Sequence, residues 1–298
     1  MLDKKYYLGI DGGGSKTEFI IIDENNNLIY RNQMGASSVD TVSLNTLKNV
    51  FVEGTKDFDG KVDAIFAGIG GIANETQRND VIEILKQLPI CKQNCKVDAG
   101  NDVINALYGG LNSQDGMIII AGTGSVCFGK NGNQFARAGG YCYQEGDAGS
   151  SYDLGMKALQ HLARVLDGRH NLTDFAKELI QVTGCDNYSS LASYFINSTR
   201  TQIASLSKVV TKHENDEYAK NIIINAVEEI LLMIKAVYNR LNYTQETIYF
   251  SIIGSLGNAN TLYKRYLLDN LSKISKSIKY IEKINDAGFG SALKAKEE

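Results

Sequence analysis

Two short glycine-rich turns carry the residues with the clearest chemical potential. The first is Gly12–Thr17, which reads Gly-Gly-Gly-Ser-Lys-Thr and directly follows Asp11. The second is Gly122–Ser125, which reads Gly-Thr-Gly-Ser. Because glycines leave the backbone open, N–H groups, hydroxyls and the lysine ammonium of such turns can surround a chain of phosphates. A carboxylate such as Asp11 beside them suits a hydrated Mg²⁺ ion. For either turn alone, a plain hairpin remains the alternative.

The first turn does not fit the two best-known phosphate-binding motifs. Ser15 rather than glycine precedes Lys16, so the turn is not a Walker A loop. No glycine completes G-x-G-x-x-G, and the residues that follow predict a strand where a dinucleotide site requires a helix. The chain also lacks the G-x-S-x-G elbow that would supply a hydrolase with its serine nucleophile.

A carboxylate at the start of a predicted helix is the candidate for proton transfer. Asp102 follows Asn101 where a helix is expected to begin, and the helix N-terminus keeps a carboxylate ionised. From that place Asp102 could accept a proton from a hydroxyl group. An ordinary N-cap is the alternative role, and Asp98 is a nearby rival for the same chemistry.

Two later segments also combine glycines with polar side chains. Residues 139–150 form a turn-rich stretch that contains Tyr141 and Asp147 and leads into a predicted helix. Gly254–Gly257 follows a buried strand and precedes another helix. A loop with an N-cap explains the first segment without function, and a tight strand–helix turn explains the second.

The elements that must position these residues follow one plan twice. Three strands joined by tight turns, a helix, a strand and a helix are predicted in the first half. The second half repeats the three strands from 117 to 138, and a helical stretch from about 150 to 242 separates them from the next strand at 247–253. The pattern predicts an α/β protein with a small domain at 1–112, a larger domain at 113–298 that contains the helical insertion, and a central cleft.

Composition excludes several classes of protein. The 298 residues include 31 Lys and Arg against 34 Asp and Glu, so the net charge is −3 and a nucleic-acid binder driven by charge is not expected. No apolar run approaches the ~18 residues of a membrane span. Five scattered cysteines, among them Cys91 and Cys95 without a zinc-spaced partner, indicate reduced thiols in a cytoplasmic protein.

Taken together, the motifs resemble a known family. They are Ile10–Thr17, Asn101-Asp102, Gly122–Ser125, Gly146–Ser150 and Ile253–Ser255. In this order they resemble the BadF/BadG/BcrA/BcrD ATPase family, and within it the N-acetylglucosamine kinases and their bacterial N-acetylglucosamine/N-acetylmuramate kinase relatives. The resemblance implies two ribonuclease-H-like domains of the actin-like ATPase kind.

The resemblance also implies roles for individual residues. It implies Asp102 as the catalytic base, and Asp11 and Asp147 as the residues that order Mg²⁺. ATP contacts are implied for Gly12, Gly13, Gly14, Ser15, Lys16, Thr17, Thr123, Gly124, Ser125, Gly254 and Ser255. Contacts with the acceptor are implied for Ser37, Ser38, Gly70, Gly71, Asn101, Asp102, Tyr141 and Asp147. Relatives often carry asparagine where this chain has Ser37-Ser38, so recognition of the sugar's 2-substituent stays open.

The function implied by the resemblance is that of an ATP-dependent kinase for the 6-hydroxyl of an amino sugar. N-acetylglucosamine is the expected acceptor, and N-acetylmuramate is a second candidate. The expected partners are the sugar, ATP and a second copy of the chain, with no nucleic acid and no membrane. Three alternatives stay open. The first is a glucosamine or other hexose kinase, and the second is a sugar-sensing regulator. The third is the ATPase activator of a 2-hydroxyacyl-CoA dehydratase, which needs cysteines to hold an iron–sulfur cluster.

Overall fold

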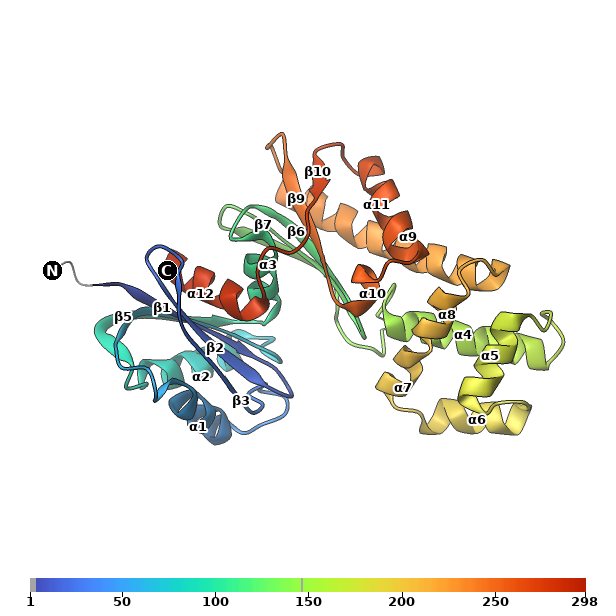
Figure 1. Cartoon of the computed structure of the whole chain (residues 1–298), viewed down its shortest axis with the longest axis horizontal. Helices are drawn as coiled ribbons and strands as arrows, with labels where there is room; N and C mark the ends of the chain where they lie inside the picture. Colours follow the sequence, from blue (N-terminus) through green and yellow to red (C-terminus); the bar gives the residue numbers. More distant parts are fainter. Residues whose placement is uncertain (1–3, 146) are drawn as a thin grey trace. The chain divides into compact units, whose positions relative to one another are not determined.

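The computed structural model describes residues 4–145 and 147–298, which form two compact units (Figure 1). The first unit contains the chain up to Gln114 together with Glu282–Glu298, and the second contains Asp115–Ile281. The sequence predicts 282–298 as part of the second domain. The structure instead places this segment in the first unit.

The first unit is built on a mixed sheet in the order β3-β2-β1-β4-β5. Strands β1, β2 and β3 are antiparallel neighbours, whereas β4 and β5 run parallel to β1. The carboxyl ends of β1 and β4 therefore lie at the same edge of the sheet. The strands are β1 (Tyr6–Gly12), β2 (Thr17–Asp23), β3 (Leu28–Met34), β4 (Val62–Ile69) and β5 (Cys91–Gly100). The helices are α1 (Leu44–Thr55), α2 (Glu75–Lys86), α3 (Val103–Leu111) and α12 (Ala287–Glu297).

The second unit repeats this plan, in the order β10-β9-β6-β7-β8. Strands β6, β7 and β8 are antiparallel, and β9 and β10 run parallel to β6. The strands are β6 (Gly116–Ala121), β7 (Ser125–Asn131), β8 (Gln134–Gly139), β9 (Ile248–Ile253) and β10 (Ile278–Tyr280). The predicted α/β class with two ribonuclease-H-like sheets is confirmed.

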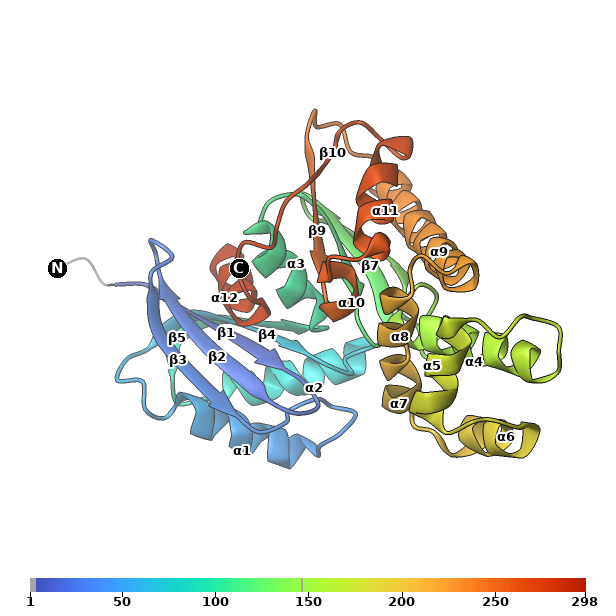
Figure 2. The same cartoon turned by 45° about the vertical axis from the view of Figure 1, so that its right-hand side comes forward.

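Helices of the second unit fall into two groups (Figure 2). The long stretch between β8 and β9 is the predicted insertion, and the remaining helices follow β9. The insertion consists of α4 (Ser151–Leu166), α5 (Asp174–Thr183), α6 (Tyr188–Asn197), α7 (Arg200–Ser205), α8 (Ser207–Lys212) and α9 (Glu217–Leu241). After β9 come α10 (Ser255–Asn258), α11 (Leu262–Asn270) and a 3₁₀ turn, η1 (Leu271–Lys273).

The C-terminal helix joins the first unit because its backbone packs closely on α3 and β1. A Cβ atom on Gly9 of β1 would collide with the backbone of Ala292 in α12. A Cβ on Gly290 of α12 would collide with the carbonyl oxygen of Asn105 in α3. Both views show α12 beside α3 (Figures 1 and 2). Glycines on two elements, β1 and α12, thus allow contacts that larger residues would prevent.

Local signals explain where the helices of the first unit begin. Ser43 caps α1, since its hydroxyl accepts a 3.2 Å hydrogen bond from the backbone N–H of Thr46. Asn74 caps α2 in the same way through the N–H of Gln77. Leu47 and Phe51 of α1 then pack against the sheet in the core of this unit.

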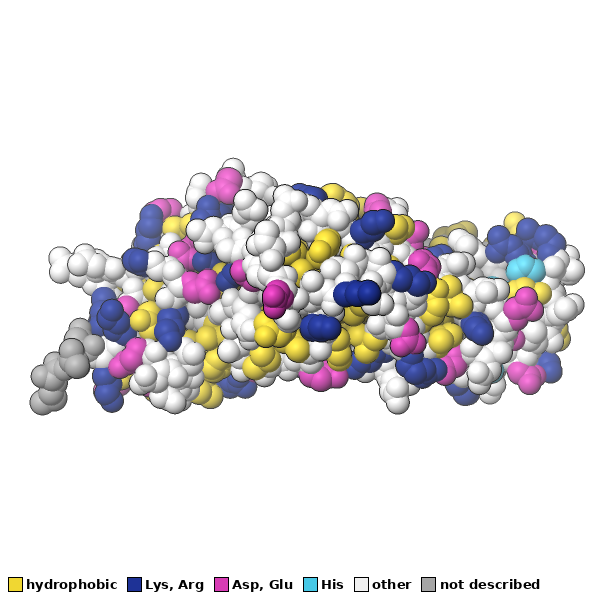
Figure 3. All heavy atoms as spheres, turned by 90° about the horizontal axis from the view of Figure 1, so that it is seen from above, with side chains coloured by type: hydrophobic (Ala, Val, Ile, Leu, Met, Phe, Trp, Pro, Cys, Tyr) yellow, Lys and Arg dark blue, Asp and Glu magenta, His cyan; other side chains and the backbone are white. Residues whose placement is uncertain are grey.

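The surface charges agree with the charge balance of the sequence, and the helices agree with the absence of a long apolar run. On the face drawn in Figure 3, basic and acidic side chains alternate, and no broad basic area gathers there. Across the described residues, none of the helices has the length and apolar character needed to cross a membrane.

Candidate functional site

The first glycine turn lies where β1 ends, and it is held by neighbouring loops. Gly12 pairs with Thr17, and the N–H of Gly13 donates a 2.9 Å hydrogen bond to the carbonyl of Lys16. The carbonyl of Gly12 accepts from the N–H of Gly70 at 2.7 Å, and that of Gly13 accepts from the N–H of Ser37 at 3.0 Å. The predicted hairpin turn is therefore present, and the loops that follow β3 and β4 are fixed around it.

Three hydroxyls of the predicted site serve this framework. Thr17 and Ser37 are fully buried, and their hydroxyl oxygens lie 2.7 Å apart. The Thr17 oxygen is also 2.6 Å from the carbonyl oxygen of Gly35. The hydroxyl of Ser38 donates a 2.9 Å hydrogen bond to the carbonyl of Gly70. These three side chains tie the loops together from within.

Asp102 lies at the start of α3, but it does not cap the helix. Its side chain makes no capping hydrogen bond. Asn101 has the local role instead: its Oδ1 accepts from the N–H of Val103 at 3.3 Å, and its Nδ2 donates to the carbonyl of Ile72 at 3.1 Å. The exposed Asp102 side chain lines a hollow of about 230 Å³ together with Asp11 and residues 12–16. The ordinary N-cap role is thus not the one that the structure shows.

The rival carboxylate Asp98 is engaged elsewhere. Its Oδ1 lies 2.6 Å from Nη2 of Arg78 in α2 and accepts a second bond from Arg78 Nε at 3.1 Å. The same oxygen accepts from the N–H of Ala99 at 2.7 Å. These bonds turn Asp98 toward α2, and it does not line the hollow that contains Asp102.

Asp11 is held by an asparagine that the sequence does not single out. Nδ2 of Asn105 donates to Asp11 Oδ1 at 2.6 Å and to the carbonyl of Gly68 at 3.0 Å. Burial raises the pKa of Asp11 to about 6; the carboxylate of Asp102 raises the pKa further, whereas the Asn105 bond lowers it. A carboxylate that is costly to ionise, beside a second carboxylate, is a place where a cation would be favoured.

Lys16 and Ser15 form the exposed side of the first turn. The Lys16 ammonium lies 2.6 Å from Glu18 Oε1, and this ion pair raises the pKa of Lys16. The lysine side chain is 58% exposed, so it can leave Glu18 for a more highly charged anion.

The second glycine turn lies where β6 ends, at the corresponding place of the second unit. Ala121 pairs with Ser125, and the N–H of Gly122 donates to the carbonyl of Gly124 at 3.0 Å. The carbonyl of Gly122 accepts from the N–H of Ser151 at 2.8 Å. The Ser125 hydroxyl donates to the carbonyl of Ala148 at 2.6 Å. The turn is therefore fixed against the first turn of α4.

A hollow of about 350 Å³ opens beside this turn. Its polar lining includes Thr123, Thr201, Ser205, Lys208, Thr211 and Ser255. Gly254 has a φ of +102°, and a Cβ there would collide with the carbonyl of Ala121, so this strand end requires glycine. The sequence does not predict that residues of α7 and α8 line this hollow, because the inserted helices carry no motif.

Asp147 is paired with an arginine that the sequence also leaves unmarked. Asp147 is 3% exposed, and one carboxylate oxygen forms an ion pair with Nη2 of Arg200. The guanidinium of Arg200 lies 5.6 Å from the ring centre of Tyr143. A Cβ on Gly124 would lie 2.7 Å from Arg200 Nη2, so the arginine lies against the second turn.

Tyr141 and Gly146 are the two other predicted positions in the segment before α4. Tyr141 is 80% exposed on the surface of the second unit. Gly146, which belongs to the predicted motif, lies outside the described residues.

Comparison with known proteins gives the two turns a common context. The sequence profile of the BadF/BadG/BcrA/BcrD ATPase family matches residues 8–292, a range that includes both turns, Asp102 and Gly254. The chain belongs to the BadF/BadG/BcrA/BcrD ATPase family. The expected family is thereby confirmed.

Named relatives of this BadF/BadG/BcrA/BcrD ATPase family member are sugar kinases. An N-acetylmuramic acid/N-acetylglucosamine kinase of Clostridium acetobutylicum is 31% identical, and the alignment covers 99% of both chains. An N-acetyl-D-glucosamine kinase of Dictyostelium discoideum is 28% identical over 99% of this chain and 98% of the relative. A Chromobacterium violaceum structure, solved as a candidate N-acetylglucosamine kinase, has the same fold, with a TM-score of 0.73 over 97% of this chain and 98% of that chain at 21% identity.

Proposed function

We propose that this protein is a kinase that transfers the γ-phosphate of ATP to the 6-hydroxyl of N-acetylglucosamine, with N-acetylmuramate as a second acceptor. One observation carries the proposal: the Asp102 carboxylate lies at a helix start without capping it, and it lines a hollow shared with the first glycine turn. The names of the relatives support the amino-sugar class of acceptor.

Asp102 is proposed as the general base. It would accept the proton of the sugar hydroxyl while that oxygen attacks the γ-phosphorus and the bond to the leaving ADP breaks. General base catalysis typically contributes about 10²–10⁴-fold to the rate. Asp98 does not fit this role, because its carboxylate is bonded to Arg78 and the backbone.

Phosphate contacts are proposed for the exposed parts of both turns. In the first unit, Gly13, Gly14, Ser15 and Lys16 line the hollow that contains Asp102. In the second unit, Thr123 lines the larger hollow. Thr17 is excluded from direct contact in this proposal, because its buried hydroxyl is bonded within the loop framework.

Kinases of this chemistry use Mg²⁺, and the residues present fit it at one position. Mg²⁺ prefers one or two carboxylates together with waters and substrate phosphates rather than a cage of protein ligands. In the described parts of the chain, no three His, Cys, Asp or Glu side chains gather to form such a cage. Asp11, beside Asp102 in the hollow, would hold the ion, which would neutralise phosphate charge. Asp147 does not fit, because Arg200 already neutralises its buried carboxylate.

The nucleoside is assigned to the hollow of the second unit. Its volume of about 350 Å³ and its hydroxyl-rich lining suit a ribose and a base, with Gly254 and Ser255 at one wall. Lys208 adds a positive charge to the same lining. Acceptor contacts are proposed for the loops of the first unit near Ser38, Gly70, Gly71 and Asn101.

A coupled assay of ADP release tests the function. Glucose, glucosamine, N-acetylglucosamine and N-acetylmuramate are supplied in turn with ATP and Mg²⁺, and the product is examined by ³¹P and ¹³C NMR. The two N-acetylated sugars should give the highest kcat/KM and a phosphate on O6. Preference for glucose or glucosamine would replace the proposed substrate, and ATP hydrolysis unaffected by any sugar would overturn kinase activity.

A further inference from the structure

Strand β5 contains a bulge that brings two cysteines together. Val62 of β4 pairs with Cys91, whereas Ala64, only two residues later, pairs with Lys96. Two residues of a strand cover about 6.6 Å, whereas five extended residues would cover ~17 Å. The segment from Cys91 to Lys96 therefore folds outward as a bulge. Cys91 and Cys95 lie at the two ends of this bulge, so they are closer together than four residues of an extended strand would place them.

Both thiols are accessible and share one environment. Each cysteine is partly buried, and both pack against the apolar core of the first unit. Cys91 Sγ lies 3.4 Å from the carbonyl oxygen of Leu85, and Cys95 Sγ lies 3.6 Å from that of Lys96. A carbonyl is a weak partner for a thiol, so an S–H hydrogen can turn from the carbonyl to the neighbouring sulfur. Neither sulfur is locked into a contact that would prevent reaction.

The two thiols differ in acidity. A hydrogen bond from Cys95 to the Cys91 sulfur lowers the pKa of Cys91, and the ammonium of Lys61 lowers it further. The same pairing with Cys91 raises the pKa of Cys95. Cys91 is thus the more acidic thiol of the pair and Cys95 the less acidic one. This division is the one that a nucleophilic and a resolving cysteine need.

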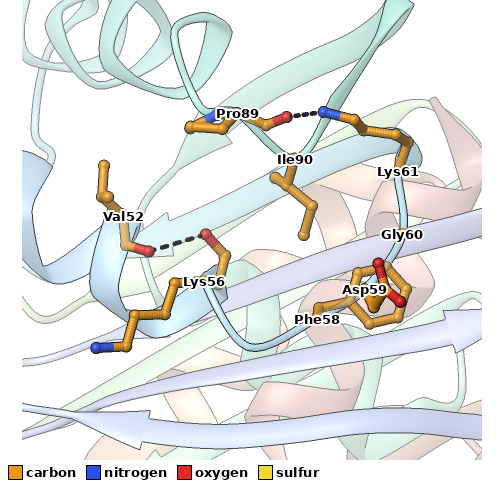
Figure 4. A pocket seen from close by; sticks show the side chains of 9 residues that line it. Val52, Lys56, Phe58, Asp59, Gly60, Lys61, Pro89 and Ile90 are labelled. Carbon is orange, nitrogen blue, oxygen red and sulfur yellow. Dashed lines mark hydrogen bonds between the residues drawn. The ribbon is translucent and has the colours of Figure 1, made fainter.

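Lys61 is held beside this pair by the loop that precedes Cys91. Its ammonium donates to the carbonyl of Pro89, as Figure 4 shows. Lys61, Pro89 and Ile90 line an open hollow of about 530 Å³ at the amino ends of β4 and β5. Neither cysteine lines this hollow, which ends at Ile90, the residue before Cys91. A small polar oxidant reaches the thiols because both are themselves partly exposed.

We propose that Cys91 and Cys95 form a reversible dithiol–disulfide site oxidised by hydrogen peroxide. The Cys91 thiolate attacks one peroxide oxygen, the O–O bond breaks, and hydroxide leaves as a sulfenic acid forms on Cys91. The hydroxide becomes water by taking up from solvent the proton that the Cys91 thiol released on ionisation. The Cys95 sulfur then attacks the Cys91 sulfur, the S–O bond breaks, and water leaves with the Cys95 proton. Two electrons pass from the sulfurs to the peroxide, and two waters result. A small dithiol then reduces the Cys91–Cys95 disulfide by thiol–disulfide exchange and is itself oxidised to a disulfide.

Mapping of tryptic peptides from the full chain tests the proposal. Trypsin separates Cys91 in fragment 87–92 from Cys95 in fragment 93–96, because Lys92 lies between them. After treatment with a small excess of peroxide and alkylation of the remaining thiols, the two fragments should appear as one cross-linked species, and dithiothreitol should separate them. Full alkylation of both cysteines, under conditions that oxidise the exposed Cys142, would overturn the proposal.

Three variants define the order of the steps. Cys95→Ser should stop at a sulfenic acid on Cys91, trapped by dimedone, whereas Cys91→Ser should give no such adduct on Cys95. Lys61→Met should slow the oxidation by roughly threefold through a smaller thiolate fraction. Cys142→Ser is the matched control and should form the 91–95 link at the rate of the unaltered chain. A dimedone adduct on Cys95 in place of Cys91 would contradict the assigned roles.

Discussion

The side-chain amide of Asn105 donates a 2.6 Å hydrogen bond to Oδ1 of Asp11 and so connects α3 with the end of β1. Asn105 is fully buried and also donates to the carbonyl of Gly68 in β4 at 3.0 Å. Asp102 lies three residues earlier, immediately before the same helix. One amide thus fixes the carboxylate proposed to hold Mg²⁺ relative to the proposed base.

Replacing this amide should impair both stability and catalysis. Asn105→Leu keeps the number and branching of the side-chain heavy atoms but leaves buried oxygens of Asp11 and Gly68 without their donor, so the free energy of unfolding should fall by about 1–3 kcal/mol. The displaced carboxylate should lower kcat by roughly 10–100-fold. Denaturant unfolding and the coupled assay measure the two effects.

The control is an asparagine with a similar structural bond in the other unit. Asn270 is buried, and its amide donates to the carbonyl of Tyr266 at 2.7 Å. Asn270→Leu should cost similar stability while kcat per folded molecule stays unchanged. Equal losses of kcat in both variants would mean that Asn105 acts on activity only through stability.

The duplicated sheets can be predicted from sequence because their signals are local. Alternating buried strands and glycine turns mark each hairpin, and the two glycine-rich turns lie at strand ends in both halves. The placement of the C-terminal helix cannot be predicted in this way. It depends on close backbone contacts that two glycines make with residues far away in the chain: Gly9 with Ala292 of α12, and Gly290 with Asn105 of α3.

The residues of the candidate site also differ in whether the sequence reveals them. The turn residues and Asp102 are visible in the sequence as motifs. Asn105 and Arg200 are not, because their partners lie 94 and 53 residues away in the chain. The sequence predicts that the hydroxyls of Thr17 and Ser37 bind a ligand. The structure buries both side chains, and the two hydroxyls are hydrogen-bonded to each other. Folding decides whether such a hydroxyl faces a ligand or the loop framework.

The threonine of the second turn gives a test of nucleotide binding. Thr123→Val removes the hydroxyl from the lining of the 350 Å³ hollow with little change of volume. KM for ATP should rise by about tenfold, the equivalent of ~1.4 kcal/mol for a hydrogen bond to a charged group. Thr183→Val is the control, because that hydroxyl donates to the carbonyl of Leu179 within α5. An unchanged KM and kcat in Thr123→Val would remove this turn from the nucleotide site.

A buried histidine should make stability depend on pH. His161 of α4 is only 3% exposed, and its ring centre lies 4.5 Å from that of Tyr218. Burial lowers the pKa of His161 to about 4, and neighbouring His170 and Arg164 lower it while Asp216 opposes them. The unfolded chain, with a histidine pKa near 6.5, binds the proton first as pH falls. The stabilising contribution is therefore present above pH ~6.5 and is lost toward pH ~4.

This loss can be measured by denaturant unfolding at a series of pH values. The histidine should account for a fall of up to about 3 kcal/mol in the free energy of unfolding between pH 6.5 and 4. The His161→Gln variant should have a lower free energy of unfolding than the unaltered chain at neutral pH. Below neutral pH, its free energy of unfolding should vary less with pH. His213→Gln is the control, because His213 lies in another part of the insertion, where its Nε2 is 2.8 Å from Oε2 of Glu178. A slope unaltered by His161→Gln would show that His161 is not the titrating group.

Replacement of the proposed base is the sharpest test of the mechanism. Asp102→Asn keeps the shape of the side chain and its hydrogen-bonding reach but removes its basicity. If Asp102 accepts the proton of the sugar hydroxyl, kcat should fall by about 10²–10⁴-fold. Sugar binding, measured by calorimetry, should persist because the amide can still form a hydrogen bond with a hydroxyl.

Asp98→Asn is the matched control: loss of its 2.6 Å pairing with Arg78 should lower stability and leave kcat nearly unchanged. If Asp98→Asn loses turnover while Asp102→Asn retains it, the base is Asp98. Retention of turnover in both variants would remove general base catalysis from this end of α3.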